Sequence, residues 1–463
     1  MQSEHSSPGQ CFANRVRGWV STSRGRQRAK RGDSVEDLLE QVTCHHHLGH
    51  LEGERPAMAD NPGTDLHQPF VGMSSTRLGR IATALNEEIE AGQFPGAVVA
   101  IARRKHLVFH EAFGHLGPDR STSMPRDAVF AIASMTKPVT GVAALLLWEE
   151  GRFGLADPID RFVPQLGNRR VAVLNERTLA GQGPIETVPA ERSITILDLM
   201  RHTSGLTYGG LGTTAVHPLY PASSNIAGAT LDSTAFLERL ATAPLLYQPG
   251  TVWEYGLSID VIGLLVEAIS GQSLGAFLEQ RLFRPLGMVN TSFQVPRNKV
   301  ARLARPLPRD PDTGDAQSVP DRATALRFEC GGGGLASTAL DYLRFAQMLL
   351  GGGVLGETHI LGRKTVEAMR ANRMTPDIAN RIAELDPSSD GYGFGLTVAV
   401  REGANTLMGS AGDFHWNGAW GTLWWADPTE DLAVVFMVQV PRLERAMRYR
   451  PLINSLVYQT LTE

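Results

Sequence analysis

The strand-like segments of this chain lie near both ends of its globular part, and helical patterns fill the region between them. Strands are predicted at 97–102, 107–112, 391–398, 421–425 and 432–437, with a turn at 427–431 between the last two. A sheet that uses both groups must be assembled from distant parts of the chain. We therefore predict an α/β (α+β) fold in which one sheet is built from the two ends around a helical insertion.

Apolar residues at helical spacing predict the helices that accompany this sheet. They lie at about 75–92, 195–201, 232–241, 258–270 and 339–350. Thr338 and Asp341 are expected to cap the last of them. The chain then divides into a disordered or targeting tail at 1–73, a discontinuous sheet domain at 74–150 and 325–463, and a helical inserted domain at 151–324.

The tail differs in composition from the rest. Residues 15–31 contain seven basic residues and no acidic ones, a pattern that fits an organellar transit peptide, a disordered tail, or upstream sequence before a start at Met58 or Met73. Cys44-His45-His46-His47 and His50 also lie here, without a scaffold to hold a metal, so no metal site is expected. We predict a cytoplasmic protein unless the tail directs import into an organelle.

The overall composition limits the kinds of molecule that we expect the protein to bind. The formal net charge of −4 gives no reason to expect a nucleic acid. The three cysteines are odd in number and widely spaced, so no disulfide framework is predicted. No stretch approaches the roughly 20 apolar residues of a membrane span. We expect a small-molecule substrate, and the sequence leaves the oligomeric state open.

Ser134 and Lys137 form the most informative motif. Three residues apart on a helical turn, they lie on the same face, so the lysine amine can take the serine proton. Pro138 lacks an amide hydrogen and is tolerated in the first helical turn, which predicts a helix that begins near Ser134. The Ser-x-x-Lys spacing also arises by chance, and on an exposed helix the two residues would simply be solvated polar side chains.

Two further segments are candidates for the same site. Tyr255 follows a Pro-Gly turn and precedes a helix, where its hydroxyl can face a cleft or simply pack on the core. In 414–422, glycines let the backbone approach a ligand, although an aromatic-rich strand edge gives the same pattern.

Two other motifs are not expected to belong to the site. Gly271-Gln-Ser273-Leu-Gly275 has the spacing of a nucleophile elbow, but helical residues precede it, so Ser273 is expected to cap the next helix. The run 331–334 is expected to be a turn near the cleft rather than a phosphate loop.

Together, Ser-x-x-Lys, a tyrosine about 120 residues later and a Trp-x-Gly strand resemble the serine β-lactamase and penicillin-binding-protein superfamily. The chain is most similar to its class C β-lactamase-like esterases, known as family VIII carboxylesterases, and to the related acyltransferases. Segments in the matching order are 199–206, 249–255, 285–288, 333–338 and 425–428. The resemblance covers residue 75 to the C-terminus and implies a β-lactamase/transpeptidase-like fold with an antiparallel sheet.

The resemblance also implies residue roles. Ser134 is the nucleophile, and Lys137 and Tyr255 are its base pair, with the acylation base left open between them. The backbone amides of Ser134 and Ala419 form the oxyanion hole. Trp416, Asn417 and Gly418 bind the substrate. No cofactor is expected.

Departures from the β-lactamase pattern indicate the substrate. Leu257 stands where those enzymes have the asparagine of Tyr-x-Asn, and Trp416 stands where they have a lysine or histidine before Thr-Gly. A site without that cation favours neutral acyl groups. We therefore predict a serine esterase that hydrolyses small carboxylic esters through an acyl-enzyme on Ser134 and can also transfer the acyl group to alcohols. The alternatives are a β-lactamase or D-alanyl-D-alanine-type peptidase, and a non-catalytic binding or scaffold homologue.

Overall fold

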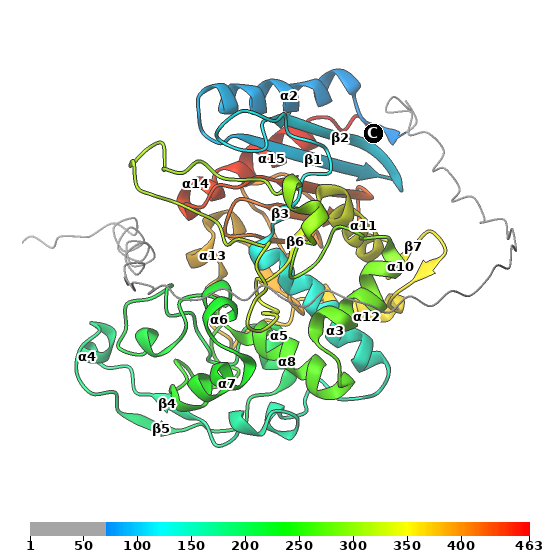
Figure 1. The fold of residues 1–463 in the computed structure, drawn as a ribbon. Coiled ribbons are helices and arrows are strands. Elements are labelled where there is room, and N and C mark those ends of the chain that lie inside the picture. The colour runs from blue at the N-terminus through cyan, green and yellow to red at the C-terminus, as the bar shows by residue number, and fades with distance from the viewer. Residues whose placement is uncertain (1–70) are drawn as a thin grey trace, which may run out of the picture.

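The computed structural model describes residues 71–463, and at its centre is a seven-stranded sheet in the order β2-β1-β13-β12-β11-β10-β9 (Figure 1). The strands are β1 (Gly96–Arg103), β2 (His106–Gly114), β9 (Tyr392–Phe394), β10 (Ala399–Arg401), β11 (Phe414–Asn417), β12 (Leu423–Asp427) and β13 (Leu432–Met437). All neighbouring strands are antiparallel. Because β1 pairs with β13, the two ends of the described chain form one sheet, as predicted.

Helices cover both faces of this sheet. They are α2 (Ser75–Glu90) and α15 (Tyr449–Tyr458) on one face, and α3 (Thr136–Glu149) and α11 (Ala339–Leu350) on the other (Figure 1). Successive strand residues point to opposite faces of the sheet. Val99 therefore packs on the face covered by α2 and α15, and its neighbour Val98 packs on the face covered by α3 and α11. Every residue of β1 and β13 is therefore buried.

The helical region lies between α3 and α11 in the chain. Its elements are β4 (Arg170–Ala172), α4 (Glu176–Leu179), β5 (Thr187–Pro189), α5 (Ile196–Met200), α6 (Ser224–Thr230), α7 (Ser233–Thr242), α8 (Ser258–Ser270), α9 (Leu274–Leu278) and α10 (Arg284–Leu286). Most of these elements form a group below the sheet, and α8 packs against α3 (Figure 1). Among residues 71–463 no single helix is long and apolar enough to cross a membrane. The helical segments Ser258–Ser270 and Leu274–Leu286, which are bent by 77° relative to each other, reach that length and composition only when taken together.

The predicted elements agree closely with the structure at α8, α11 and β13. Thr338 caps α11 by accepting the amide hydrogen of Asp341, at 3.2 Å. The single strand predicted at 391–398 is wrong: β9 ends at Phe394 and pairs back onto β10, so residues 395–398 make a hairpin turn in which Thr397 has φ of +73°. The tail and its Cys44–His50 cluster lie outside the described residues.

Candidate active site

Ser134 lies in a short turn between the strand β3 (Phe130–Ala131) and the helix α3. This turn is a 3-10 helix, Ala133–Met135, and α3 follows it directly from Thr136. The helical segment therefore begins near Ser134, as predicted. Ala133 has φ of +45°, a left-handed conformation that is costly for a residue with a Cβ atom. The buried Tyr342 hydroxyl donates to the Met135 carbonyl, at 2.7 Å, and helps to hold the turn.

Lys137 is completely buried one turn after Ser134. Its Nζ is 3.1 Å from Ser134 Oγ, 3.0 Å from the Tyr208 hydroxyl oxygen and 2.6 Å from the Gly332 carbonyl oxygen. The structure therefore brings Ser134 and Lys137 together, in a geometry that suits proton transfer between them. Gly332 lies in the turn that the sequence predicted near the cleft.

Tyr255 contacts Lys137 through its ring and not through its oxygen. Lys137 Nζ lies 4.6 Å from the centre of the Tyr255 ring, a cation–π distance. The Tyr255 oxygen accepts a hydrogen bond from Trp416 Nε1, at 3.2 Å. Both side chains line the pocket that contains Ser134. Trp416 thus orients the Tyr255 hydroxyl as well as forming a wall.

The phenol that hydrogen-bonds to Lys137 is Tyr208, which the sequence analysis missed. It lies in a loop after α5, two residues beyond a segment that matched the family. Burial, and then the negative charge of Asp260, raises the pKa of Tyr208 well above its usual value, so it remains protonated. Gly256 explains how the two tyrosines meet: a Cβ atom there would lie 2.5 Å from the Leu206 carbonyl oxygen. Their rings are 5.4 Å apart.

A close backbone approach joins the end of β11 to the Ser134 turn. A Cβ atom on Gly418 would lie 2.6 Å from the Ile132 carbonyl oxygen and 2.1 Å from Thr422 Oγ1, so only glycine fits. As a result Ala419, the next residue, lines the same pocket as Ser134. The two residues whose amides are predicted to form the oxyanion hole therefore line one pocket, and their role stays a prediction.

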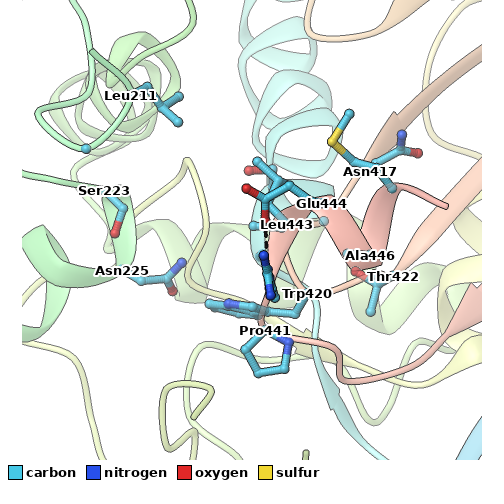
Figure 2. Close-up of a pocket in the computed structure, with 18 of the residues that line it drawn as sticks. Leu211, Ser223, Asn225, Asn417, Trp420, Thr422, Pro441, Leu443, Glu444 and Ala446 are labelled. Atoms are coloured by element: carbon cyan, nitrogen blue, oxygen red, sulfur yellow. Dashed lines mark hydrogen bonds and ion pairs between the residues drawn. The ribbon is translucent and has the colours of Figure 1, made fainter. Parts of the chain in front are cut away.

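The pocket around Ser134 has a volume of about 730 Å³. Leu211, Ser223 and Asn225 of the helical region form one side, and Asn417, Trp420 and Leu443 of the sheet region lie opposite (Figure 2). Helix α14 (Leu443–Met447) and the loop at 310–318 supply further wall. The site therefore lies between the two parts of the described chain.

The two arginines that line the pocket are paired with carboxylates. Arg450 binds Asp386, at 2.9 Å. Arg442 contacts Asp310 and Glu444, each at 3.4 Å. Asn417 directs its amide nitrogen toward Asp386, at 3.4 Å. Both arginines of the wall are therefore paired, and the carboxylates that line the pocket outnumber them: Asp310, Asp315, Asp386 and Glu444.

His202 lies against the far side of Tyr255. Its ring centre is 4.9 Å from that of Tyr255 and 5.6 Å from that of Phe394. Burial, followed by the positive charge of Lys137, holds the pKa of His202 well below its usual value, so this histidine is neutral. It packs as an aromatic ring in the wall behind the tyrosine.

Other sequence candidates lie outside this site. Ser273 caps α9 by accepting the Ala276 amide hydrogen, at 3.3 Å, as predicted. Within residues 71–463, no group of three or more histidine, cysteine, aspartate or glutamate side chains is arranged to hold a metal ion.

Comparisons with known proteins agree with this architecture. The model of the family described as Beta-lactamase matches residues 81–458. "Protein Rv1367c" of Mycobacterium tuberculosis is 37% identical over 364 residues, 77% of this chain and 88% of that protein. "Esterase EstB" of Burkholderia gladioli is 28% identical over 387 residues, covering 77% of this chain and 89% of EstB. A solved structure of "EstCE1, a hydrolase with promiscuous acyltransferase activity" is similar with a TM-score of 0.66 and 27% identity, over 83% of this chain and 99% of that one. The predicted fold class, an antiparallel sheet flanked by helices, is confirmed.

Proposed function

The chain belongs to the beta-lactamase family, and on that premise we propose that it is a serine carboxylesterase that forms an acyl-enzyme on Ser134. The observation that carries the proposal is the buried Lys137 amine, 3.1 Å from Ser134 Oγ in a pocket of about 730 Å³. The names of two similar proteins, an esterase and a hydrolase with acyltransferase activity, support the same reaction type.

In this mechanism Ser134 Oγ bonds to the acyl carbon while its proton passes to Lys137. The negative oxygen of the tetrahedral intermediate is held by the amides of Ser134 and Ala419. The carbon–oxygen bond to the alcohol then breaks, and the alcohol leaves with a proton from the Lys137–Tyr255 pair. Water, or another alcohol, then bonds to the acyl carbon and gives its proton to the same pair. The bond from the acyl carbon to Ser134 Oγ breaks, the pair returns a proton to Ser134, and the acid or the new ester leaves.

The pocket wall supports neutral esters as substrates. Arg450 and Arg442 are held by carboxylates, so neither offers a free charge to a substrate carboxylate. The indole nitrogen of Trp416 is occupied by Tyr255. Leu257 is fully buried and is absent from the pocket wall. A penicillin or a D-alanyl peptide would therefore bring its carboxylate into the pocket without a partner.

Two serine variants test this proposal. Ser134→Ala should abolish hydrolysis of short p-nitrophenyl esters, because the nucleophile is lost. Ser273→Ala removes a helix cap, which costs about 0.5–2 kcal/mol of stability, and should keep most of the activity. The reverse result would overturn the assignment, and activity in neither the wild type nor Ser273→Ala would favour a non-catalytic homologue.

A β-lactamase is the second candidate function, because the family carries that name. We expect nitrocefin turnover to be far slower than ester turnover, since no free cation faces the pocket. Comparable rates on the two substrates would show that the lack of a free cation is not the selective feature. Adding alcohols to the ester assay and measuring new esters distinguishes acyl transfer from hydrolysis.

A further inference from the structure

A chain of buried polar groups extends from Lys137 into the helical region. The Tyr208 hydroxyl lies 2.6 Å from Ser224 Oγ, at the start of α6. Ser224 Oγ donates to Asp260 Oδ2, at 2.7 Å, in the first turn of α8. Asp260 is 0% exposed, and Ser224, 2% exposed, and Tyr208 lie at the inner wall of the pocket. The proposed mechanism does not use Ser224 or Asp260.

The direction of each hydrogen bond follows from Asp260. One carboxylate oxygen accepts from Ser224 and the other from the Gly332 amide, at 2.9 Å. Both oxygens act as acceptors, as expected of an ionised carboxyl at a helix N-terminus. Since Ser224 has a single hydroxyl hydrogen, it must accept from Tyr208. Tyr208 must then accept from Lys137, at 3.0 Å.

The Gly332 peptide closes the chain into a ring. Its N–H donates to Asp260, and its carbonyl accepts from Lys137 Nζ, at 2.6 Å. Two of the acceptors of Lys137 Nζ, the Tyr208 oxygen and the Gly332 carbonyl, therefore have positions that depend on Asp260. The third direction of Nζ points to Ser134 Oγ, at 3.1 Å: the ammonium donates along it, and in the proposed mechanism the neutral amine has its lone pair there.

We propose that Asp260 is a positioning residue that acts through Ser224, Tyr208 and the Gly332 peptide to direct the Lys137 lone pair at Ser134. The inference rests on the proposed function, because it explains how the nucleophile is activated. When Lys137 takes the Ser134 proton, the ammonium keeps its two acceptors and holds the new hydrogen toward the leaving alcohol. Asp260 supplies the opposite charge for that ammonium across the ring.

The charged surroundings agree with this role. Burial raises the pKa of Asp260 above its usual value, and Lys137 and the hydrogen bonds from Ser224 and Gly332 offset only part of that rise. Other titratable groups that face the ring are Tyr255, His202 and Cys330. Burial, then the charge of Asp260, raises the pKa of Cys330 to about 12, so this thiol stays neutral. Asp260 is therefore the one negative charge among these groups.

Asp260→Asn is the informative change, because asparagine has the shape of aspartate but reverses the direction of the hydrogen bonds that run from Ser224 to Tyr208 and Lys137. The Gly332 amide can only donate, so the asparagine oxygen must face it and the asparagine NH₂ must face Ser224. Ser224 then donates to Tyr208, and Tyr208 donates into the Lys137 lone pair. That hydrogen bond competes with proton transfer from Ser134.

The assay is the rate of Ser134 modification by a fluorophosphonate, followed by mass spectrometry of the intact protein as a function of pH. Ser134 Oγ bonds to phosphorus, fluoride leaves and the proton goes to Lys137, so no natural substrate is needed. We expect Asp260→Asn to lower the plateau rate constant about 10- to 100-fold, the range of one hydrogen bond to a charged group. The acidic limb of the profile should move to lower pH, because the charge that favoured the ammonium is gone.

Ser224→Ala is the second variant, for the case that Asp260→Asn does not fold. It should lower the rate constant while the final labelled fraction remains complete. Glu267→Gln is the matched control, because it removes a charge from the same helix two turns away, where Glu267 accepts from Leu274. It should change neither the rate constant nor the limb.

The results separate two failures. If the wild type is not labelled at Ser134, the proposed function is wrong. If the wild type is labelled and the Asp260 and Ser224 variants keep its rate constant, or lose only labelled fraction, the residues are structural and the positioning role is overturned. A lowered plateau for Asp260→Asn with an unmoved acidic limb overturns it as well.

Discussion

Gly418→Ala is predicted to disable the oxyanion hole while leaving the nucleophile in place. The added Cβ would lie 2.6 Å from the Ile132 carbonyl oxygen, a backbone atom that cannot rotate away. The end of β11 must move by about 0.8 Å to reach ordinary contact at 3.4 Å. Such a shift carries the Ala419 amide away from the oxyanion. Losing one donor of this kind costs about 10²- to 10³-fold in kcat.

The measurement is kcat and KM for a p-nitrophenyl ester, normalised to the sites that a fluorophosphonate labels. KM should change little, since the pocket wall is retained. Overpacking should cost about 1–3 kcal/mol and lower Tm by several degrees. Gly403→Ala is the control, because nothing lies within 4 Å of its Cβ position. A Gly418→Ala enzyme with lowered Tm and a wild-type kcat per labelled site would refute the placement of the oxyanion at Ala419.

Two further predictions concern the aromatic wall and the buried histidines. Tyr255→Phe keeps the ring beside Lys137 and removes the hydroxyl, so kcat should fall about 10²- to 10⁴-fold with little change in Tm; a wild-type kcat would exclude the hydroxyl from proton transfer. His202 and His415 both have a folded-state pKa well below 6.5, mainly because of burial, so the unfolded state binds more protons below pH 6.5 and the free energy of unfolding falls as the pH drops. Urea unfolding should show a loss of about 1.4 kcal/mol per pH unit for each histidine between pH 6.5 and 5, and His202→Phe should reduce that slope; an unchanged slope would show that His202 is protonated in the fold.

The sequence predicted the regular elements because their patterns are local. The buried residues of α8 are mostly apolar, and β13 is a continuous buried strand, so their bounds followed from periodicity and turn residues. The hairpin at 395–398 could not be predicted in this way. Gly395 approaches the Met369 carbonyl, 2.1 Å from its Cβ position, and Thr397 adopts a left-handed conformation, both of which depend on packing with distant residues.

The site shows the same division. Ser134 and Lys137 are neighbours on one turn, so their spacing contained the information. Tyr208 reaches Lys137 from a loop without periodicity, and only the close packing of Gly256 on that loop brings it there. Asp260 did leave a signal, because it is an isolated carboxylate in the apolar stretch Leu257-Ser-Ile-Asp-Val-Ile, and such a residue must find partners when buried.

The two tyrosines contact one lysine in different ways, and this difference explains how the site can have one mobile proton. The Tyr208 hydrogen is engaged by Ser224, and its pKa is held well above the usual value by burial and by Asp260, so it serves as a fixed acceptor for Lys137. The Tyr255 oxygen instead accepts from Trp416 Nε1, and its ring lies beside Lys137 Nζ, although both tyrosines line the pocket. In the proposed mechanism a phenol whose hydrogen is held by Ser224 does not exchange it, whereas Tyr255, whose oxygen accepts from Trp416, exchanges its hydrogen with a bound alcohol or water. If the Asp260 ring were broken, the two roles would no longer be distinct, and proton transfer from Ser134 would slow even though every group that touches the substrate remained.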